Sequence, residues 1–263
     1  MGPTGATDQS ARDAPAKVMT TRPLLAGQSL LVIGGSSGIG LETARQGREE
    51  GATVIITARD PERVHRAGID LGASIAAFDA TDFQRLERFF DELSTPVDHL
   101  LVSGPAPHDG PLVSLSVESA RADLDAHLVL PLQVARVAPT VIRPAGTLIF
   151  IGCIDGGHAV AGRTLISGMT AALSMITKGL AFELAPIRVN LIAAGFVDTP
   201  LAANALGDQL DSRREELTKK LPIRRVIGPT DVAALALHLM TNTAVTGATF
   251  DIDGGQQLVR VGQ

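Results

Sequence analysis

Short apolar runs alternate with longer segments of helical periodicity along most of this chain. The runs are rich in Val, Ile and Leu, as buried strands are, and they read SLLVIGG, ATVIITA, ASIAAF, VDHLLVS, GTLIFIG, IRVNLIAA and ATFDI. Helices are expected between them, over residues of about 38–51, 61–71, 82–93, 116–142 with a kink at Pro131, 163–185, 200–220 and 230–241. This alternation predicts a doubly wound α/β fold, with a seven-stranded parallel sheet that has helices on both faces and binds ligands at the carboxyl ends of its strands.

The chain has no internal linker after its first residues, so we expect one domain over 25–263. Residues 1–24 mix Gly, Pro, Thr and both charges, which predicts a mobile tail and not a secretory signal. The sequence contains no run of about 18 apolar residues, so we expect no membrane-spanning helix. A cytoplasmic protein is therefore expected.

Charge and composition narrow the chemistry. The 23 Lys and Arg against 28 Asp and Glu give a net charge of −5, which argues against nucleic acid or an anionic membrane as partner and favours a small-molecule substrate. The single Cys153 excludes a disulfide scaffold, and no spacing indicates a metal site. The chain contains no Tyr and no Trp, so any mechanism that needs a phenol is excluded.

A glycine-rich turn joins the first strand to the first helix. It reads Gly34-Gly35-Ser36-Ser37-Gly38-Ile39-Gly40, with SLLVIGG before it and helical periodicity after it. Glycines let the backbone approach a pyrophosphate, whose charge is held by free N–H groups at the positive end of the helix dipole. The context predicts a dinucleotide-binding turn of the Rossmann type, and the alternative is a tight turn without a ligand.

This turn resembles the TGxxxGxG of the short-chain dehydrogenase/reductase family. FDATD is similar to the family's DVTD, LAFELAPIRVNLIAAGFVDTP to its LAxELAPxxIRVNxIxPGxVxTP, and VTGATFDIDGG to its TGxxxxVDGG. The resemblance covers roughly residues 25–257 and implies the fold expected from the pattern. It also implies hydride transfer between a nicotinamide cofactor and a carbonyl or alcohol.

The resemblance further implies where a cofactor would bind. Family members that prefer NAD usually end the second strand with an acidic residue, but Ala58 stands there and Arg59 follows. A guanidinium suits the 2′-phosphate of NADP, so we expect NADP(H); the alternative for Arg59 is a solvated surface arginine. By the same resemblance the cofactor is bordered by Asp79 and Ala80 at the adenine, Val197 and Thr199 at the carboxamide, and Ser103 and Gly104, which belong to the SGPA segment in place of the family's NNAG.

The family's catalytic positions are altered. Its YxxxK pair falls on Ile166 and Thr170, its serine on Cys153, and its asparagine most plausibly on His127. Isoleucine has no exchangeable proton and threonine has no ammonium charge. General acid–base help is worth about 10²- to 10⁴-fold, so carbonyl reduction by the usual route should be severely impaired.

Other groups are candidates for the missing proton donor. His127 titrates in the useful range, and Cys153 is an acid or nucleophile if its thiolate is stabilised. The alternatives are a packed helical histidine and a small core residue. His108 and His158, with Asp109 and Asp155, lie in loops over the expected cleft and are either substrate-facing or solvated.

Three functions remain open at this point. The first is an NADP(H)-dependent oxidoreductase with an atypical proton donor, and the second is a non-redox biosynthetic enzyme such as a cyclase, isomerase or dehydratase. The third is a catalytically silent cofactor-binding or assembly subunit. A homo-oligomer, dimer or tetramer, is expected by resemblance, since small residues in the fifth helical segment permit close helix packing: Ser167, Gly168, Ala171, Ala172 and Ser174.

Overall fold

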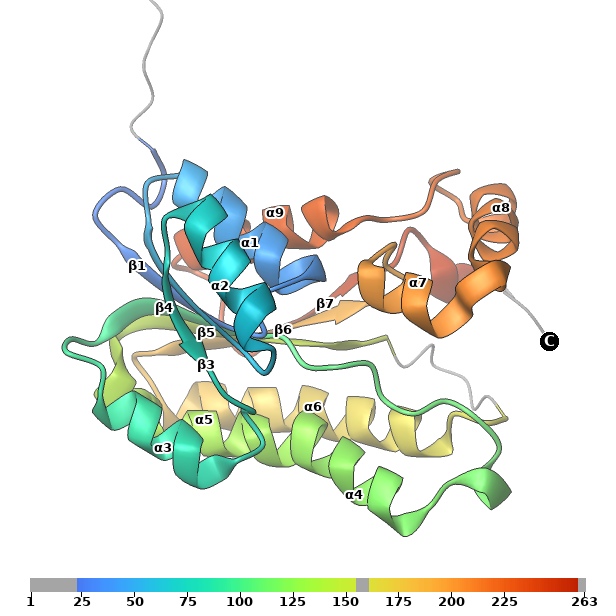
Figure 1. Cartoon of the computed structure of the whole chain (residues 1–263), viewed down its shortest axis with the longest axis horizontal. Coiled ribbons are helices and arrows are strands. Elements are labelled where there is room, and N and C mark those ends of the chain that lie inside the picture. Colours follow the sequence, from blue (N-terminus) through green and yellow to red (C-terminus); the bar gives the residue numbers. More distant parts are fainter. Residues whose placement is uncertain (1–22, 155–160, 260–263) are drawn as a thin grey trace, which may run out of the picture.

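A computed structural model of the protein describes residues 23–154 and 161–259. Its strands are β1 (Ser29–Ile33), β2 (Thr53–Ala58), β3 (Ser74–Ala77), β4 (Val97–Val102), β5 (Ile142–Cys153), β6 (Arg188–Ala194) and β7 (Thr249–Ile252). They form one parallel sheet in the order β3-β2-β1-β4-β5-β6-β7 (Figure 1). The predicted single-domain, seven-stranded doubly wound fold is confirmed. The predicted N-terminal tail lies outside the described residues up to residue 22.

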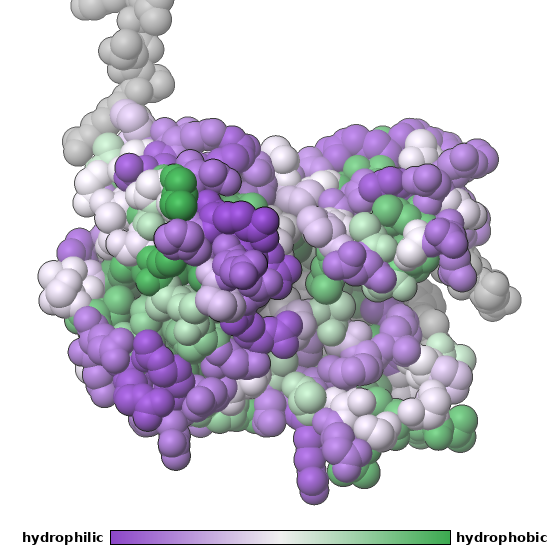
Figure 2. Space-filling view, in the orientation of Figure 1, coloured by the Kyte–Doolittle hydropathy of each residue, from purple (hydrophilic) through white to green (hydrophobic). Residues whose placement is uncertain are grey.

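Helices cover both faces of the sheet. They are α1 (Gly38–Glu49), α2 (Pro61–Leu71), α3 (Phe83–Asp91), α4 (Val117–Leu124), α5 (Leu130–Val141), α6 (Thr164–Glu183), α7 (Pro200–Leu206), α8 (Leu210–Lys220) and α9 (Pro229–Thr241). Figure 1 shows α1, α2 and α9 on one face, α3, α5 and α6 on the other, and α7 with α8 as a lobe to one side. Polar side chains cover most of the face seen in Figure 2.

Alternate residues of the central strands feed two apolar cores. On β4, Leu100 packs into the cluster that includes α3 and α5, while Leu101 packs into the one that includes α1 and α9. Neighbouring side chains on a strand point to opposite faces, so a strand buried on both faces is mostly apolar. This is why the strands were readable as continuous apolar runs, and every residue of β6 is buried.

The long helix predicted over 116–142 is broken into two. A π-helical turn over Asp125–Val129 separates α4 from α5, and Pro131 lies in the first turn of α5. Proline has no N–H to donate to the preceding turn, so the helix restarts there and the wider π turn absorbs the mismatch. The stretch predicted over 200–220 is also two helices, α7 and α8, separated by a 3₁₀ turn over Gly207–Gln209.

By length and composition α6 is apolar enough to cross a membrane, with a mean hydropathy of 1.4 over its best window, although the sequence was expected to contain no such segment. Its buried side chains are Ile166, Met169, Leu173 and Thr177, which share one face of the helix. Leu173 belongs to the core cluster that contains β5 and β6 residues. In this fold α6 packs on the sheet. Of the residues in the apolar window of α6, 22% are buried.

Arg188, the first residue of β6, links the sheet to the C-terminal end of α9. Its buried guanidinium donates to the carbonyls of Leu239, Met240, Asn242 and Val245, and to Thr147 Oγ1 on β5. The last carbonyls of a helix have no partner within the helix, so a cation placed there both satisfies them and complements the helix dipole. Arg188 therefore ties α9 to β5 and β6 without any carboxylate.

A second buried titratable group, His99, lies on β4. Its Nε2 is 2.6 Å from Gln28 Oε1, while its Nδ1 has no hydrogen-bond partner among the described residues. Burial lowers the pKa of His99 to about 4; the charge of Arg188 acts in the same direction and that of Asp98 opposes it. The folded protein therefore keeps this imidazole neutral.

Protonation of His99 should destabilise the fold in acid. Unfolded histidine titrates near about 6.5, so between about pH 6.5 and 4 the unfolded chain binds more protons, and the free energy of unfolding should fall as the pH is lowered. His99→Gln removes the titrating group and keeps a donor for Gln28. Urea unfolding at pH 7 and pH 5 should show a drop of up to about 2 kcal/mol that is smaller in the variant. Equal drops in both proteins would contradict this assignment.

Candidate functional site

The turn between β1 and α1 is packed so closely that side chains are excluded. A Cβ on Gly34, where φ is +84°, would lie 2.1 Å from the carbonyl oxygen of Ser103, and a Cβ on Gly40 would lie 2.2 Å from that of Gly34. Gly38 starts α1 with φ at +54°. These positions require glycine, so the spacing seen in the sequence is a requirement of this backbone.

The N-terminus of α1 is free to hold an anion. Ser37 occupies the cap position, but its side chain makes no capping hydrogen bond to the helix. The first N–H groups of a 12-residue helix are thus left for another acceptor, and the helix dipole favours a negative one. Ser36 is buried, and Ile39 packs against the core below the turn. The cradle fits a pyrophosphate, as the sequence predicted.

The turn lies at the point in the sheet where the order of the strands reverses. β1 pairs with β2 on one side and with β4 on the other, and chain order runs outward from this point. Gly34 and Gly35 both donate to Thr57 O on β2, while Ser103 donates to Ile33 O on β1. Ligands of doubly wound sheets bind at this crevice, because the connections leave toward opposite faces.

Arg59 stands at the end of β2 with its side chain 67% exposed. Its Nη1 lies 3.9 Å from Asp79 Oδ2, and Asp79 uses Oδ1 to accept from Thr81. Such an exposed pair is weak, so the guanidinium remains available to a phosphate. Asp79 and Ala80 follow β3, next to β2, as the predicted adenine border requires.

The loop after β6 closes the other side of the crevice. Val197 is buried and pairs with Ile227, and the Thr199 hydroxyl caps α7 by accepting from Ala202 N. The methyl group of Thr199 lies 3.5 Å from the place of a Cβ on Gly38. The segment predicted at the carboxamide thus reaches the phosphate turn, and the predicted positions for a dinucleotide form a continuous track.

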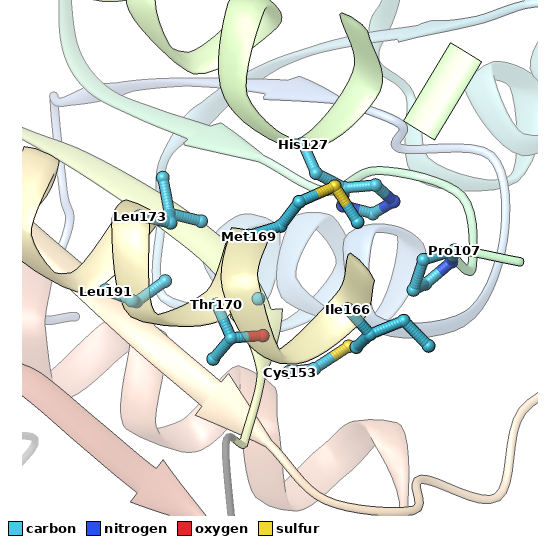
Figure 3. A pocket seen from close by; sticks show the side chains of 9 residues that line it. Pro107, His127, Cys153, Ile166, Met169, Thr170, Leu173 and Leu191 are labelled. Atoms are coloured by element: carbon cyan, nitrogen blue, oxygen red, sulfur yellow. The ribbon is translucent and has the colours of Figure 1, made fainter. Parts of the chain in front are cut away.

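The four residues that the resemblance assigns to the family's catalytic positions line one hollow. His127 lies on the π turn, Cys153 ends β5, and Ile166 with Thr170 lie in the first turns of α6 (Figure 3). They line a small open hollow with Pro107, Gly152, Met169, Leu173 and Leu191. A Cβ on Gly104 would lie 3.6 Å from His127 Cε1, so the segment after β4 borders the same place.

Neither candidate acid in this hollow is charged near neutral pH. Burial lowers the pKa of His127, although the nearby charge of Asp123 opposes the shift, and its Nε2 is buried without a partner among the described residues. Burial raises the pKa of the Cys153 thiol in spite of Arg163. Cys153 is therefore a thiol at neutral pH, which does not favour the nucleophile that a stabilised thiolate would provide.

A histidine in the loop after β4 is held more firmly than the sequence suggested. His108 Nδ1 lies 2.8 Å from Asp123 Oδ1, and the His108 backbone N–H donates to Asp123 Oδ2. The loop is also tied to the start of α6 by Gly110 N to Gly162 O and by an ion pair of Asp109 with Arg163. His158 and Asp155 lie outside the described residues.

Asp123 was missed from the sequence. The available signal was its spacing, since Asp123 and His127 are one helical turn apart and so share a face of that segment. His108 lines a second hollow between the loop and α6, and Asp123 holds the His108 side chain there. Within residues 23–154 and 161–259 no three His, Cys, Asp or Glu side chains are placed to hold a metal ion.

Comparisons with known proteins agree with this architecture. Residues 33–257 match the protein family described as "Enoyl-(Acyl carrier protein) reductase". The chain is 30% identical over 255 residues to the short-chain dehydrogenase/reductase ATR9 of Stachybotrys chlorohalonatus, covering 89% of this chain and 98% of that protein.

Solved structures are similar over the same length. The MalC Reductase/Diels-Alderase from Malbranchea aurantiaca superposes with a TM-score of 0.83 at 26% identity, over 90% of this chain and 99% of that one. BdcA, in a crystal structure in complex with NADPH, gives a TM-score of 0.79 at 26% identity, over 88% and 95% of the two chains.

Proposed function

Because the chain belongs to the short-chain dehydrogenase/reductase family of oxidoreductases, we propose that it is an NADP(H)-dependent oxidoreductase acting on a small carbonyl compound or alcohol. The observation that carries this proposal is the intact dinucleotide cradle. Gly34 and Gly40 leave no room for a side chain, and α1 offers an uncapped N-terminus. Such a turn lets a pyrophosphate approach the backbone and the positive end of the helix dipole.

The preference for NADP(H) rests on the end of β2. Ala58 offers no carboxylate for a ribose hydroxyl, and Arg59 presents an exposed guanidinium beside it. BdcA, which superposes on this chain, binds NADPH. Asp79 competes only weakly with a phosphate for the Arg59 guanidinium. Its Oδ2 is 3.9 Å from Arg59 Nη1, and its Oδ1 accepts a hydrogen bond from Thr81.

When bound, NADPH supplies a hydride to the carbonyl carbon, and the chain must supply a proton to the oxygen. Ile166 is 3% exposed and packs in the position where the family has its tyrosine, so it contributes no proton. Thr170 has no charge to hold the nicotinamide ribose. The donor therefore has to come from another element of the cleft.

A second candidate function is non-redox catalysis, such as cyclisation, isomerisation or dehydration. It is favoured by two observations: both members of the tyrosine–lysine pair are absent, and MalC, a Reductase/Diels-Alderase, shares this fold. In that case the apolar hollow beside Ile166 and Leu173 would bind the substrate, and any dinucleotide would be structural.

We also propose that the protein is a homo-oligomer that pairs through α6. Met175 is 65% exposed and Phe182 is 89% exposed, and a Cβ on Gly168 or Gly179 would meet nothing within 4 Å. These positions, with Ala171, form one exposed stripe. Ser174 was expected in the interface but bonds Thr249 on β7, so it faces the sheet.

Nicotinamide fluorescence tests the cofactor, and with no Trp or Tyr in the chain the protein background is low. We expect NADPH to bind more tightly than NADH. Arg59→Ser should weaken NADPH about tenfold or more, because a charge-assisted phosphate contact is lost, and should leave NADH almost unchanged. Arg136→Ser on α5 is the control. Equal affinities for both cofactors in the wild type would contradict the role of Arg59.

Substrate turnover distinguishes reduction from non-redox chemistry. We expect the wild type to oxidise NADPH in the presence of at least one of 4-nitrobenzaldehyde, ethyl acetoacetate and 9,10-phenanthrenequinone, with one NADPH consumed per carbonyl reduced. Absorbance at the nicotinamide band and chromatography of the product measure the two quantities. Tight NADPH binding without oxidation by any probe would favour the non-redox alternative.

Light scattering during gel filtration tests the assembly. The wild type should elute as a dimer or tetramer, and Phe182→Glu should shift it toward the monomer because a charge would be buried in the interface. Ile69→Glu is the matched control, since Ile69 is an exposed apolar residue on α2. A monomeric wild type, or the same shift in both variants, would contradict pairing through α6.

A further inference from the structure

His108 and Asp123 form a dyad at the mouth of the cleft. Both carboxylate oxygens of Asp123 are used, one at 2.8 Å from His108 Nδ1 and the other at 3.1 Å from the His108 backbone nitrogen. The Asp123 side chain is 5% exposed, whereas that of His108 is 56% exposed. A buried carboxylate thus orients an imidazole that solvent can reach.

This geometry fixes the chemistry of the imidazole. A carboxylate only accepts, so Nδ1 carries a proton and Nε2 is the nitrogen left for a substrate. A histidine whose second nitrogen is held by a buried carboxylate is the arrangement that general acid–base catalysis requires.

The dyad lies beside a cavity adjacent to the altered catalytic positions. His108 lines the second hollow together with Leu112, Leu115, Leu165, Ser114 and Thr164. The preceding residue, Pro107, lines the smaller hollow with Ile166, which follows Leu165. The two hollows are therefore neighbours along the same two segments, the loop after β4 and the start of α6.

We propose that His108 is the catalytic proton donor of the reductase, taking over from the absent tyrosine, and that Asp123 is its positioning residue. This inference rests on the proposed oxidoreductase function. The carbonyl carbon gains a hydride from NADPH, which is oxidised to NADP⁺, and the carbonyl oxygen gains the proton that leaves His108 Nε2. The neutral imidazole then takes a proton from water, which its exposure allows.

The alternative donors are less suited to this step. The Nε2 of His127 is buried, and burial disfavours its imidazolium form. The Cys153 thiol is held protonated by burial, so it gives up its proton reluctantly. The imidazole of His108 hydrogen-bonds a buried carboxylate and is open to solvent, whereas His127 Nε2 and the Cys153 thiol are buried.

Kinetics of variants form the first test, with the carbonyl probe that the wild type reduces fastest. His108→Gln should lower kcat about 100-fold or more, because acid catalysis is lost, while the Kd for NADPH stays unchanged. Asp123→Asn should lower kcat about tenfold or more with KM little changed, because an amide cannot accept both hydrogen bonds and permits the wrong tautomer. His65→Gln on α2 is the control, since His65 is exposed and remote from the cleft. Imidazole in the buffer should restore part of the activity of His108→Gly.

A second readout needs no turnover. NADP⁺ cannot donate a hydride, so a complex with NADP⁺ and the carbonyl probe remains unreacted. We expect this mixture to protect His108 from diethyl pyrocarbonate, as mapped by mass spectrometry, and to leave the labelling of His65 unchanged. Protection of His108 reports contact with the probe independently of catalysis.

The outcomes separate the two proposals. An active wild type with an equally active His108→Gln, or with His108 unprotected, overturns the assignment of the donor and leaves the reductase proposal standing. Loss of activity in His127→Gln but not in His108→Gln transfers the role to His127 and also overturns it. A wild type that binds NADPH but reduces no probe removes the reductase proposal and the donor assignment together.

Discussion

The contact between Gly34 and the end of β4 determines the shape of the cleft. Because a Cβ on Gly34 would overlap the Ser103 carbonyl, the phosphate turn and the loop after β4 must start from the same point. From there α1 leaves toward one face of the sheet, while residues 104–111 cross above the strand ends. Gly104 then meets His127, and His108 reaches Asp123. One close backbone approach thus sets where the cofactor cradle and the loop that carries the candidate acid begin.

The residues that stabilise the fold are only partly separate from the site. Arg188 links β5, β6 and α9, whereas Leu173 and Leu191 of one apolar core also line the hollow beside Cys153. In the hollow itself, Ile166 and Leu173 are buried apolar side chains. Replacing a phenol by Ile166 converts a reactive position into a packing position, which the scaffold tolerates because folding depends on burial and not on the lost hydroxyl.

The sequence was informative where a local pattern coincides with a structural requirement. Central strands are buried on both faces, so they stand out as apolar runs, and Gly34 and Gly40 are required by their own backbones. The π turn before Pro131 was not foreseen, because a proline in a periodic segment shows where a helix is disturbed but not whether it bends or restarts. The assignment of the altered catalytic positions rests on the family's spacing alone, whereas the protonation states of His127 and Cys153 depend on burial.

The pairing of His108 with Asp123 shows the limit of such reasoning. The loop that carries His108 has no periodicity, so its path is decided by tertiary contacts that no local pattern encodes. The structure supplies three of these contacts, and they are unequal. The Asp109–Arg163 ion pair is exposed and weak, and the bond of Gly110 to Gly162 is a single backbone contact. Only Asp123 is buried and bidentate, so the position of His108 depends mainly on that carboxylate. A proton donor on this loop approaches the substrate from the β4 side of the cleft, whereas the family's tyrosine approaches from α6. Because no residue in the first turn of α6 then has to donate the proton, the apolar residues there can line the substrate pocket.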